Sequence, residues 1–396
     1  MPWKETSAMN ERVQFIADYL REEWPLSELC RMYGISRPTA YKWIERYEEE
    51  GVKGLQERSR APHRHPNAVP EEIERRIVEH REAHPTWGPK KLIPDLRKLH
   101  PGQPKWPSLS TVGDILKRHG LVKSRRRRNH ATPTSHPLTE GKEANGVWCA
   151  DFKGDFRTQD GTRCLPFTLS DACTRFLLRC HGLERIYSER VKGLFEASFY
   201  EFGLPQVIRT DNGPPFASIG LGGLSRLSIW WMKLGIAPER IDPGKPYQNG
   251  KHERLHRTLK EEAINPPRRT LRAQQRAFDR FREEYNFVRP HEALGQTPPG
   301  DHYTYSPRSY SPRLAEIEYP TSQQVRRVKL HGEICWRGRR VFLSEVLRGE
   351  YVGLEEEEER YWSIYFADFR IGYLDEKTGK VKRIKRIERI GKEGEE

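Results

Sequence analysis

The stretch from residue 207 to residue 260 constrains the fold more than any other part of this 396-residue chain. It opens with the apolar pair Val207-Ile208, which has the character of a buried strand. Asn212-Gly213 follows and supplies the positive φ that a tight reversal needs. Asp211 therefore lies at the carboxyl end of a strand, where open α/β sheets place their ligand sites. We predict an α/β domain with Asp211 at its functional edge.

The second half of this stretch predicts a helix that begins near Gly250. Leu255 and Leu259 lie four residues apart and therefore share one helix face. Glu253 and Lys260 lie seven residues apart, so they fall on one side of the helix, two turns from each other. A carboxylate delivered by this helix can meet one delivered by the end of a strand.

A third carboxylate interrupts an apolar run upstream. Residues 147–156 have strand character, and Asp151 lies among them, where a lone carboxylate is unfavourable unless it is paired or binds a cation. Hard divalent cations prefer oxygen ligands, so Asp151, Asp211 and Glu253 together predict a site for Mg2+ or Mn2+. Two such ions about 3.5–4 Å apart can activate one oxygen and stabilise another at phosphorus. We expect two ions in each active site.

Several short motifs occur in a fixed order and resemble a known family. They are Trp148-x-x-Asp151, Thr210-Asp211-Asn212-Gly213, the helix start at Glu253, the trailing Lys260, and the segment 285–295. These motifs resemble the acidic triad, basic residue and closing segment of DDE-type bacterial insertion-sequence transposases with a retroviral-integrase-like core. The match covers about residues 145–299. The last two acids are separated by 41 residues, a longer spacing than in the commonest members, and we place the extra length in the Gly-rich segment 218–223.

The resemblance implies both a fold and a reaction. The core would have an RNase H-like α/β fold, with Asp151, Asp211 and Glu253 as catalytic residues and metal ligands and Lys260 on a DNA phosphate. The enzyme would bind the ends of a mobile element, hydrolyse the phosphodiester to free 3′-hydroxyls, and join them to target DNA by two-metal transesterification. Because two ends are cut together, a homo-oligomer on double-stranded DNA is expected.

Two other functions compete with this interpretation. His252-Glu253-x-x-His256 fits the H-E-x-x-H pattern of zinc metalloproteases, in which two histidines hold zinc and the glutamate activates water. Lys251 and Arg254 charge a helix that such proteases bury, so we expect the two histidines to be exposed or to contact DNA. The other competitor is a DNA-binding regulator that keeps the fold without the chemistry. The presence of all three acids argues against it.

The first 57 residues predict a helix-turn-helix domain. Apolar residues recur at helical spacing in three short segments between residues 10 and 50, and Ser36 can cap the third segment. The second helix of such a motif enters the major groove of DNA. A plain three-helix bundle is the alternative. The residues near the start of the third segment that we expect to contact DNA are Arg37, Thr39, Tyr41 and Lys42.

The rest of the chain divides at changes of composition. We predict a multidomain protein with all-α helix-turn-helix modules, an α/β RNase H-like core and a small C-terminal β-barrel. In the basic linker, Arg125, Arg126, Arg127 and Arg128 are expected to track DNA phosphates. The predicted segments after residue 57 are a linker (58–70), a second helical DNA-binding domain (71–122), the basic linker (123–144), the core (145–299), a linker (300–320), the barrel (321–376) and a charged tail (377–396).

Charge and cysteine content fit an intracellular DNA-binding protein. Lys and Arg total 70 against 56 Asp and Glu, and the formal net charge of +14 favours a polyanionic partner. The six cysteines form no C-x-x-C pair, as expected for reduced thiols in the cytoplasm. No apolar run of about 18 residues occurs, which argues against a membrane span. We expect a cytoplasmic, DNA-associated bacterial protein. An acidic run at residues 355–359 is expected to be a loop and has no assigned role.

Overall fold

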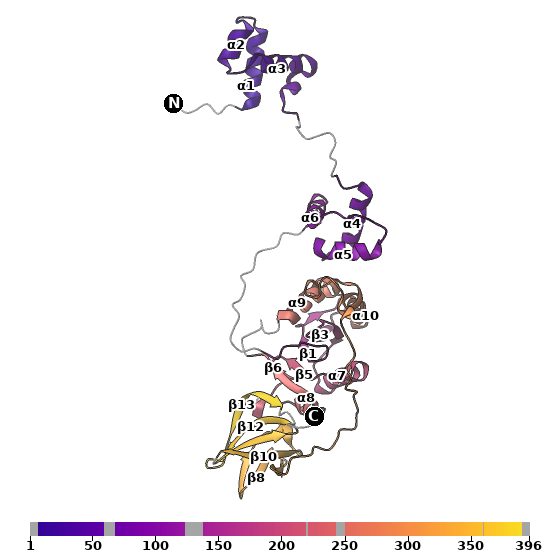
Figure 1. Cartoon of the computed structure of the whole chain (residues 1–396), viewed down its shortest axis with the longest axis vertical. Coiled ribbons are helices and arrows are strands. Elements are labelled where there is room, and N and C mark those ends of the chain that lie inside the picture. The colour runs from indigo at the N-terminus through magenta and orange to yellow at the C-terminus, as the bar shows by residue number, and fades with distance from the viewer. Residues whose placement is uncertain are drawn as a thin grey trace. The chain divides into compact units, whose positions relative to one another are not determined.

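The computed structural model describes residues 7–58, 68–122, 138–218, 221–242, 250–358 and 360–389. These residues form two compact units, Met1–Val69 and Pro70–Glu396 (Figure 1). Among the described helices, none is long and apolar enough to cross a membrane.

The first unit contains three helices, in the three segments where the sequence predicted them. They are α1 (Ala8–Leu20), α2 (Leu26–Met32) and α3 (Arg37–Glu50), followed by a 3-10 turn at Gly51–Leu55. The Ser36 hydroxyl accepts the Thr39 N–H and caps α3, whose first turn contains Pro38. The buried side chains that hold the bundle together include Phe15, Ile16, Leu29, Ala40, Trp43, Ile44 and Leu55.

The second unit begins with three more helices. They are α4 (Glu71–Ala83), α5 (Pro89–Leu99) and α6 (Leu109–Arg118). Apolar residues at helical spacing are buried between them, including Ile77, Leu92, Leu96, Val112, Ile115 and Leu116. The last of these helices begins after Ser108, whose hydroxyl accepts the Thr111 N–H.

A six-stranded mixed sheet follows. The strand order is β2-β3-β1-β5-β6, and β4 also pairs with β3. Strand β1 pairs antiparallel with β3 and parallel with β5, which in turn pairs parallel with β6. The strands are β1 (Val147–Phe152), β2 (Phe156–Arg157), β3 (Arg163–Asp171), β4 (Leu177–Leu183), β5 (Val207–Thr210) and β6 (Ala237–Arg240).

Two pairs of helices bury apolar residues against this sheet. The helices are α7 (Ser188–Phe202), α8 (Arg226–Lys233), α9 (Gly250–Leu259) and α10 (Leu271–Glu283). Phe167 and Leu169 of β3 share a core with α7 and α8, whereas Cys164 and strand β4 share a second core with α9 and α10. Both α9 and α10 end in π-helical turns, at Lys260–Ile264 and Glu284–Val288. The sheet is therefore covered by helices, as an RNase H-like α/β core requires.

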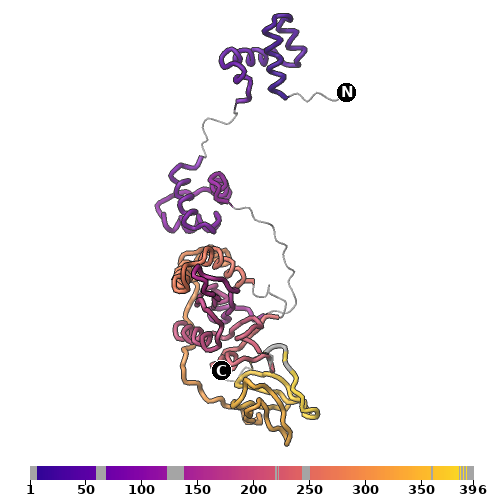
Figure 2. The backbone as a smooth tube through the Cα atoms, turned by 180° about the vertical axis from the view of Figure 1, so that it is seen from behind, coloured from indigo at the N-terminus to yellow at the C-terminus, as the bar shows by residue number. Residues whose placement is uncertain are grey.

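The C-terminal part is rich in strands, which Figure 2 shows together at the yellow end of the chain. Five strands form an open sheet in the order β13-β12-β11-β10-β7, and β8 and β9 form a separate hairpin. Within the described residues this hydrogen-bonded sheet does not close on itself. The strands are β7 (Gln324–Arg327), β8 (Glu333–Trp336), β9 (Arg339–Phe342), β10 (Tyr351–Glu358), β11 (Tyr361–Phe366), β12 (Phe369–Asp375) and β13 (Lys380–Arg389).

Two expectations for this part were wrong. Residues 355–358 belong to strand β10 and pair with β11, so most of the acidic run is not a loop. Strand β13 pairs with β12 beyond residue 376, inside the expected charged tail. Strand β7 pairs with β10 only at residues 351–354, so the glutamates lie beyond the end of β7. Strand β13 is at the edge of the sheet, where charged residues are tolerated on the exposed face.

Helix α8 is shared between two cores. Leu227, Trp230 and Trp231 pack with α7 against the mixed sheet. Ile229 and Met232 pack instead with the C-terminal strands.

Candidate active site

Pairing between strands β1 and β5 places two acids side by side. Cys149 of β1 is the register partner of Arg209 of β5, and the two strands run parallel. Asp151 lies two residues beyond Cys149, and Asp211 lies two residues beyond Arg209. The two carboxylates therefore leave the carboxyl ends of neighbouring parallel strands, which is where open sheets bind ligands.

Each of these acids is held by a local hydrogen bond. Asp151 Oδ1 accepts the Phe152 N–H at 2.7 Å, and the Asp151 side chain is 23% exposed. Asp211 Oδ1 accepts the Gly213 N–H at 3.2 Å, in the turn that Asn212-Gly213 was expected to form. A carboxylate has several acceptor sites on its two oxygens, so a hydrogen bond of this kind is compatible with binding a cation.

Helix α9 presents the third acid. Glu253 is exposed, while two histidines of the same helix are buried, with His252 only 2% exposed and His256 6% exposed. The two histidines were expected to be exposed or to contact DNA, and the structure shows them buried instead. They lie on the same side of the helix as Leu255 and Leu259, whose burial in the core carries both rings inward.

A threonine of the sheet holds this buried face in place. Thr168 Oγ1 lies 2.7 Å from Nε2 of His252 and 2.7 Å from Nε2 of His256. Ser170 Oγ lies 3.3 Å from Nδ1 of His252. Thr168 is also the register partner of Asp151 across β1 and β3. The same residue therefore fixes the helix that presents Glu253 and pairs with the strand that carries Asp151.

The electrostatics of the site favour a cation. Burial raises the pKa of Asp151 to about 7, and the negative charge of Asp211 contributes to this rise. The Phe152 N–H and Lys153 lower the pKa of Asp151, and Glu253 raises it. Burial also raises the pKa of Asp211, against the hydrogen bond from Gly213. A bound cation would offset the repulsion that Asp211 and Glu253 exert on Asp151.

The arrangement does not suit a zinc protease. One atom each of Asp151, His252 and His256 could surround an ion, since these atoms lie within 4.8 Å of one another. The Nε2 atoms of both histidines, however, are hydrogen-bonded to the Thr168 hydroxyl. Burial lowers the pKa of His252 to about 3 and that of His256 to about 2, so both rings are neutral and serve as hydrogen-bonding partners.

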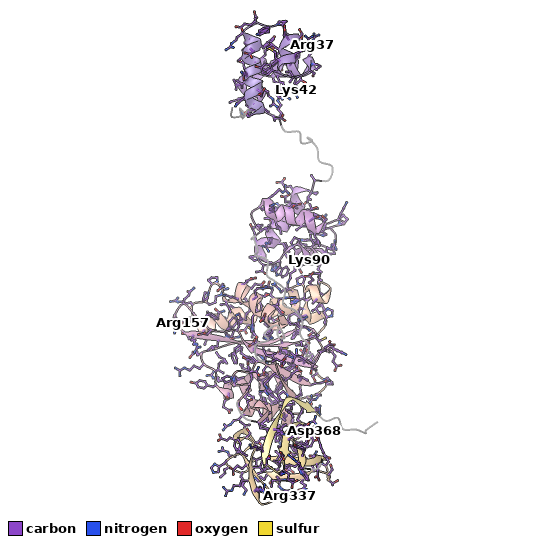
Figure 3. All side chains as sticks on the ribbon, turned by 90° about the vertical axis from the view of Figure 1, so that its left-hand side faces the viewer. Arg37, Lys42, Lys90, Arg157, Arg337 and Asp368 are labelled. Atoms are coloured by element: carbon purple, nitrogen blue, oxygen red, sulfur yellow. The ribbon has the colours of Figure 1, made fainter. Side chains whose placement is uncertain are left out.

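The other predicted DNA contacts are placed as follows. Lys260 is exposed at the start of a π-helical turn. Arg37, Tyr41 and Lys42 are exposed on α3, and Figure 3 labels Arg37 and Lys42 there, while the Thr39 hydroxyl lies 2.8 Å from Ser36 Oγ. The four arginines at 125–128 lie outside the described residues.

Replacing Thr168 by valine should destabilise the protein without changing its volume much. The change leaves the Nε2 atoms of His252 and His256 buried without their partner, which costs about 1–3 kcal/mol for each unsatisfied group. Chemical denaturation of the unaltered protein and the variant measures this loss. Thr258→Val is the control, because the Thr258 hydroxyl donates to the Arg254 carbonyl at an exposed position. An equal effect of both variants would contradict the role of Thr168.

Models of known domains match most of the chain. A helix-turn-helix domain matches residues 11–63, and a homeodomain-like domain matches residues 39–116. Two models of the integrase core domain match residues 141–246 and 234–299. The C-terminal domain of IS481 family transposases matches residues 323–382.

Proteins of two insertion elements are also similar to this chain. The uncharacterized 39.2 kDa protein of insertion element IS476 from Xanthomonas euvesicatoria is 30% identical over 287 residues, which are 70% of this chain and 72% of that protein. A protein of insertion element IS407 from Burkholderia multivorans is 30% identical over 184 residues, which are 46% of this chain and 63% of that protein. A chain of the simian T-cell lymphotropic virus intasome structure is 18% identical, with a TM-score of 0.37, over 80% of this chain and 99% of that chain. The sequence relatives and the domain models identify the family.

Proposed function

This chain belongs to the DDE-type insertion-element transposases that carry an integrase core, and we propose that Asp151, Asp211 and Glu253 are the acids with which it cuts and joins DNA. The observation that carries this proposal is the parallel pairing of β1 and β5, which brings Asp151 and Asp211 to matching positions. Glu253 comes from α9, and its charge acts on Asp151.

The three acids fit divalent cations of the magnesium class. All three offer carboxylate oxygens, which hard cations prefer, and their mutual repulsion is relieved by positive charge. Two Mg2+ or Mn2+ ions held by Asp151, Asp211 and Glu253 would neutralise charge at phosphorus and activate the attacking oxygen. The residues of this chain supply the fixed geometry, through the β1–β5 register and the contacts of Thr168.

The proposed reaction has two displacements at phosphorus. In the first, a water oxygen attacks the phosphodiester at the end of the element, the bond from phosphorus to the 3′ oxygen breaks, and the oxygen leaves as a 3′-hydroxyl. In the second, that hydroxyl loses its proton and attacks a phosphodiester of the target, where the bond to the target's own 3′ oxygen breaks. Both steps need only positioning and charge stabilisation, which carboxylate-held cations provide.

DNA binding is proposed for several other parts of the chain. Helix α3 would enter the major groove with Arg37, Tyr41 and Lys42 on its exposed side, and Lys260 would contact a phosphate near the acids. The segments 1–57 and 71–122 would bind the element ends in an oligomer, and the core would act on them. The C-terminal strands would form a small barrel with the β8–β9 hairpin. We place the enzyme in the cytoplasm, bound to DNA.

The test uses purified protein and labelled DNA from the flanks of its own gene. We expect cleaved and joined products with Mg2+ and none with a chelator or with Glu253→Gln. Glu261→Gln is the matched control, since Glu261 is a nearby exposed acid outside the proposed triad. Tight binding of correct ends without products under any divalent cation would instead support the DNA-binding regulator.

Cation binding should become stronger as the pH rises through 7. The pKa of Asp151 in the cation-free protein is about 7, so its proton must leave before a cation binds. The ionised fraction grows about tenfold between pH 6 and pH 8. Titration calorimetry with Mn2+ should therefore give up to about tenfold tighter binding at pH 8. Equal affinities at the two pH values would contradict this assignment.

The raised pKa of Asp151 also predicts that the cation-free protein becomes less stable as the pH rises. Between pH 4 and pH 7 the folded protein holds a proton on Asp151 that the unfolded chain releases, because the pKa is raised from 3.8 to about 7. The contribution of Asp151 to the free energy of unfolding therefore falls as the pH rises over this range. Denaturant unfolding at several pH values in a chelator measures this fall, and the Asp151→Asn variant should lack it.

A further inference from the structure

A second group of metal-binding side chains lies in α4 and α5, away from the three acids. His80, His84 and Asp95 each offer one ligand atom, and these atoms all lie within 4.8 Å of one another. His80 lies in the last turn of α4, and His84 is the residue that follows the end of the helix. Asp95 comes from α5 and is 7% exposed.

His80 and Asp95 bring two potential ligand atoms close together. His80 Nε2 and Asp95 Oδ2 are 2.9 Å apart. Despite this distance, the oxygen does not lie where the ring N–H could donate to it, and His80 Nε2 is buried without a hydrogen bond. Ligand atoms around tetrahedral zinc lie about 3.3–3.6 Å apart, given metal–ligand distances of about 2.0–2.2 Å, so the two side chains would move apart slightly to admit an ion. A cation between the two atoms would satisfy the ring nitrogen and the buried carboxylate together.

The residues around His84 also orient its ring for binding a metal. Its Nδ1 lies 3.0 Å from Glu284 Oε1, and since a carboxylate only accepts, the Nδ1–H donates. This tautomer leaves the lone pair on Nε2 available. Metal-binding histidines commonly have such a carboxylate behind them, which orients the ring and raises its basicity. The ring of His84 is also stacked on Trp87, with centroids 4.0 Å apart and an interplanar angle of 15°.

We propose that His80, His84 and Asp95 bind one transition-metal cation of the zinc class, with a fourth position for water. Two imidazole nitrogens and one carboxylate oxygen suit Zn2+, whereas Mg2+ prefers oxygen ligands throughout. The ion would connect the end of α4 to α5. This site differs from the proposed catalytic one in location, in ligand chemistry and in metal, so each can be tested without the other.

The experiment counts zinc bound to the full-length protein. All samples carry Asp151→Asn, so that a cation near the catalytic acids does not add to the count. After removal of metals, excess Zn2+ is added, the protein is dialysed, and its zinc is measured. We expect His84→Gln and Asp95→Asn to hold one zinc per chain less than the parent. His100→Gln, a histidine of the same helical segment outside the cluster, should match the parent.

Unfolding temperatures show whether a variant has lost zinc binding or has failed to fold. Zn2+ should raise the unfolding temperature of the parent and of His100→Gln but not that of His84→Gln. Glu284→Gln leaves all three ligands in place and should weaken zinc binding by about 10–100-fold. This variant keeps the test valid if a ligand substitution prevents folding. Equal zinc content in the parent and His84→Gln, or unchanged affinity in Glu284→Gln, would overturn the proposal.

Discussion

Replacing Asp151 by asparagine should lower the rate of DNA strand transfer by about a thousandfold or more. Stabilisation of the transition state by carboxylate-held cations is worth several kcal/mol, and each 1.36 kcal/mol corresponds to about a factor of ten. The asparagine side chain would keep an oxygen that accepts the Phe152 N–H but would lack the charge that binds a cation. Joined products from labelled element ends, measured over time with Mg2+, give the rate.

This substitution should spare folding and DNA binding. Ionised Asp151 is unfavourable without a cation, since burial and Asp211 both raise its pKa. The variant should therefore be at least as stable as the unaltered protein at pH 8 in a chelator. Asp155→Asn is the control, because Asp155 is exposed and accepts a hydrogen bond from Arg163 at 2.8 Å. Loss of end binding in the Asp151 variant would count against a catalytic role.

Replacing Arg209 by leucine should lower the free energy of unfolding by about 3–5 kcal/mol. Arg209 Nε lies 2.7 Å from Glu239 Oε2, and the two side chains are 10% and 5% exposed. The substitution leaves the Glu239 carboxylate buried without this positive partner. Thr139 also donates to Glu239, from its N–H and its hydroxyl. Denaturant unfolding of both proteins measures the difference.

Two further variants test the explanation. Leucine at both Arg209 and Glu239 should recover much of the loss, because a buried ion pair can be replaced by apolar residues with little change in stability. Arg163→Leu breaks an exposed pair, in which the side chains are 52% and 51% exposed, and should change stability by only about 0–1 kcal/mol. A double variant as unstable as Arg209→Leu would mean that packing, rather than loss of the ion pair, dominates.

The sequence was sufficient to predict the three helices of the first unit and the turn after Asp211. Ser36 caps the third of these helices as expected, and the turn follows from Asn212-Gly213. Such features depend on neighbouring residues, so local patterns are enough. The pairing of β1 with β5 depends on residues about 60 positions apart. The residues of one strand alone do not show which residues of the other strand they pair with. We expected the three acids to lie together because of the motif resemblance.

The alternation of polar and apolar residues in β3 indicates that one face of this strand is polar. Thr168 and Ser170 alternate with Phe167 and Leu169 in the strand, and two small hydroxyls on one face of a buried strand indicate polar partners. The identity of those partners, on α9, could not be read from either segment alone. For the same reason the burial of His252 and His256 could not be predicted from Lys251 and Arg254, which are exposed residues of the same helix.

Helix α8 limits which domains of this protein could be exchanged with those of related transposases. Its side chains belong to different cores, with Trp231 packed against the mixed sheet and Met232 against the C-terminal strands. A recombination event that replaced only the C-terminal strands would set a foreign surface against Ile229 and Met232. The incoming strands would have to match those side chains, or α8 would have to come with them. The core and the C-terminal strands should therefore be inherited together. The helices before residue 59 belong to a separate compact unit, which can be exchanged on its own.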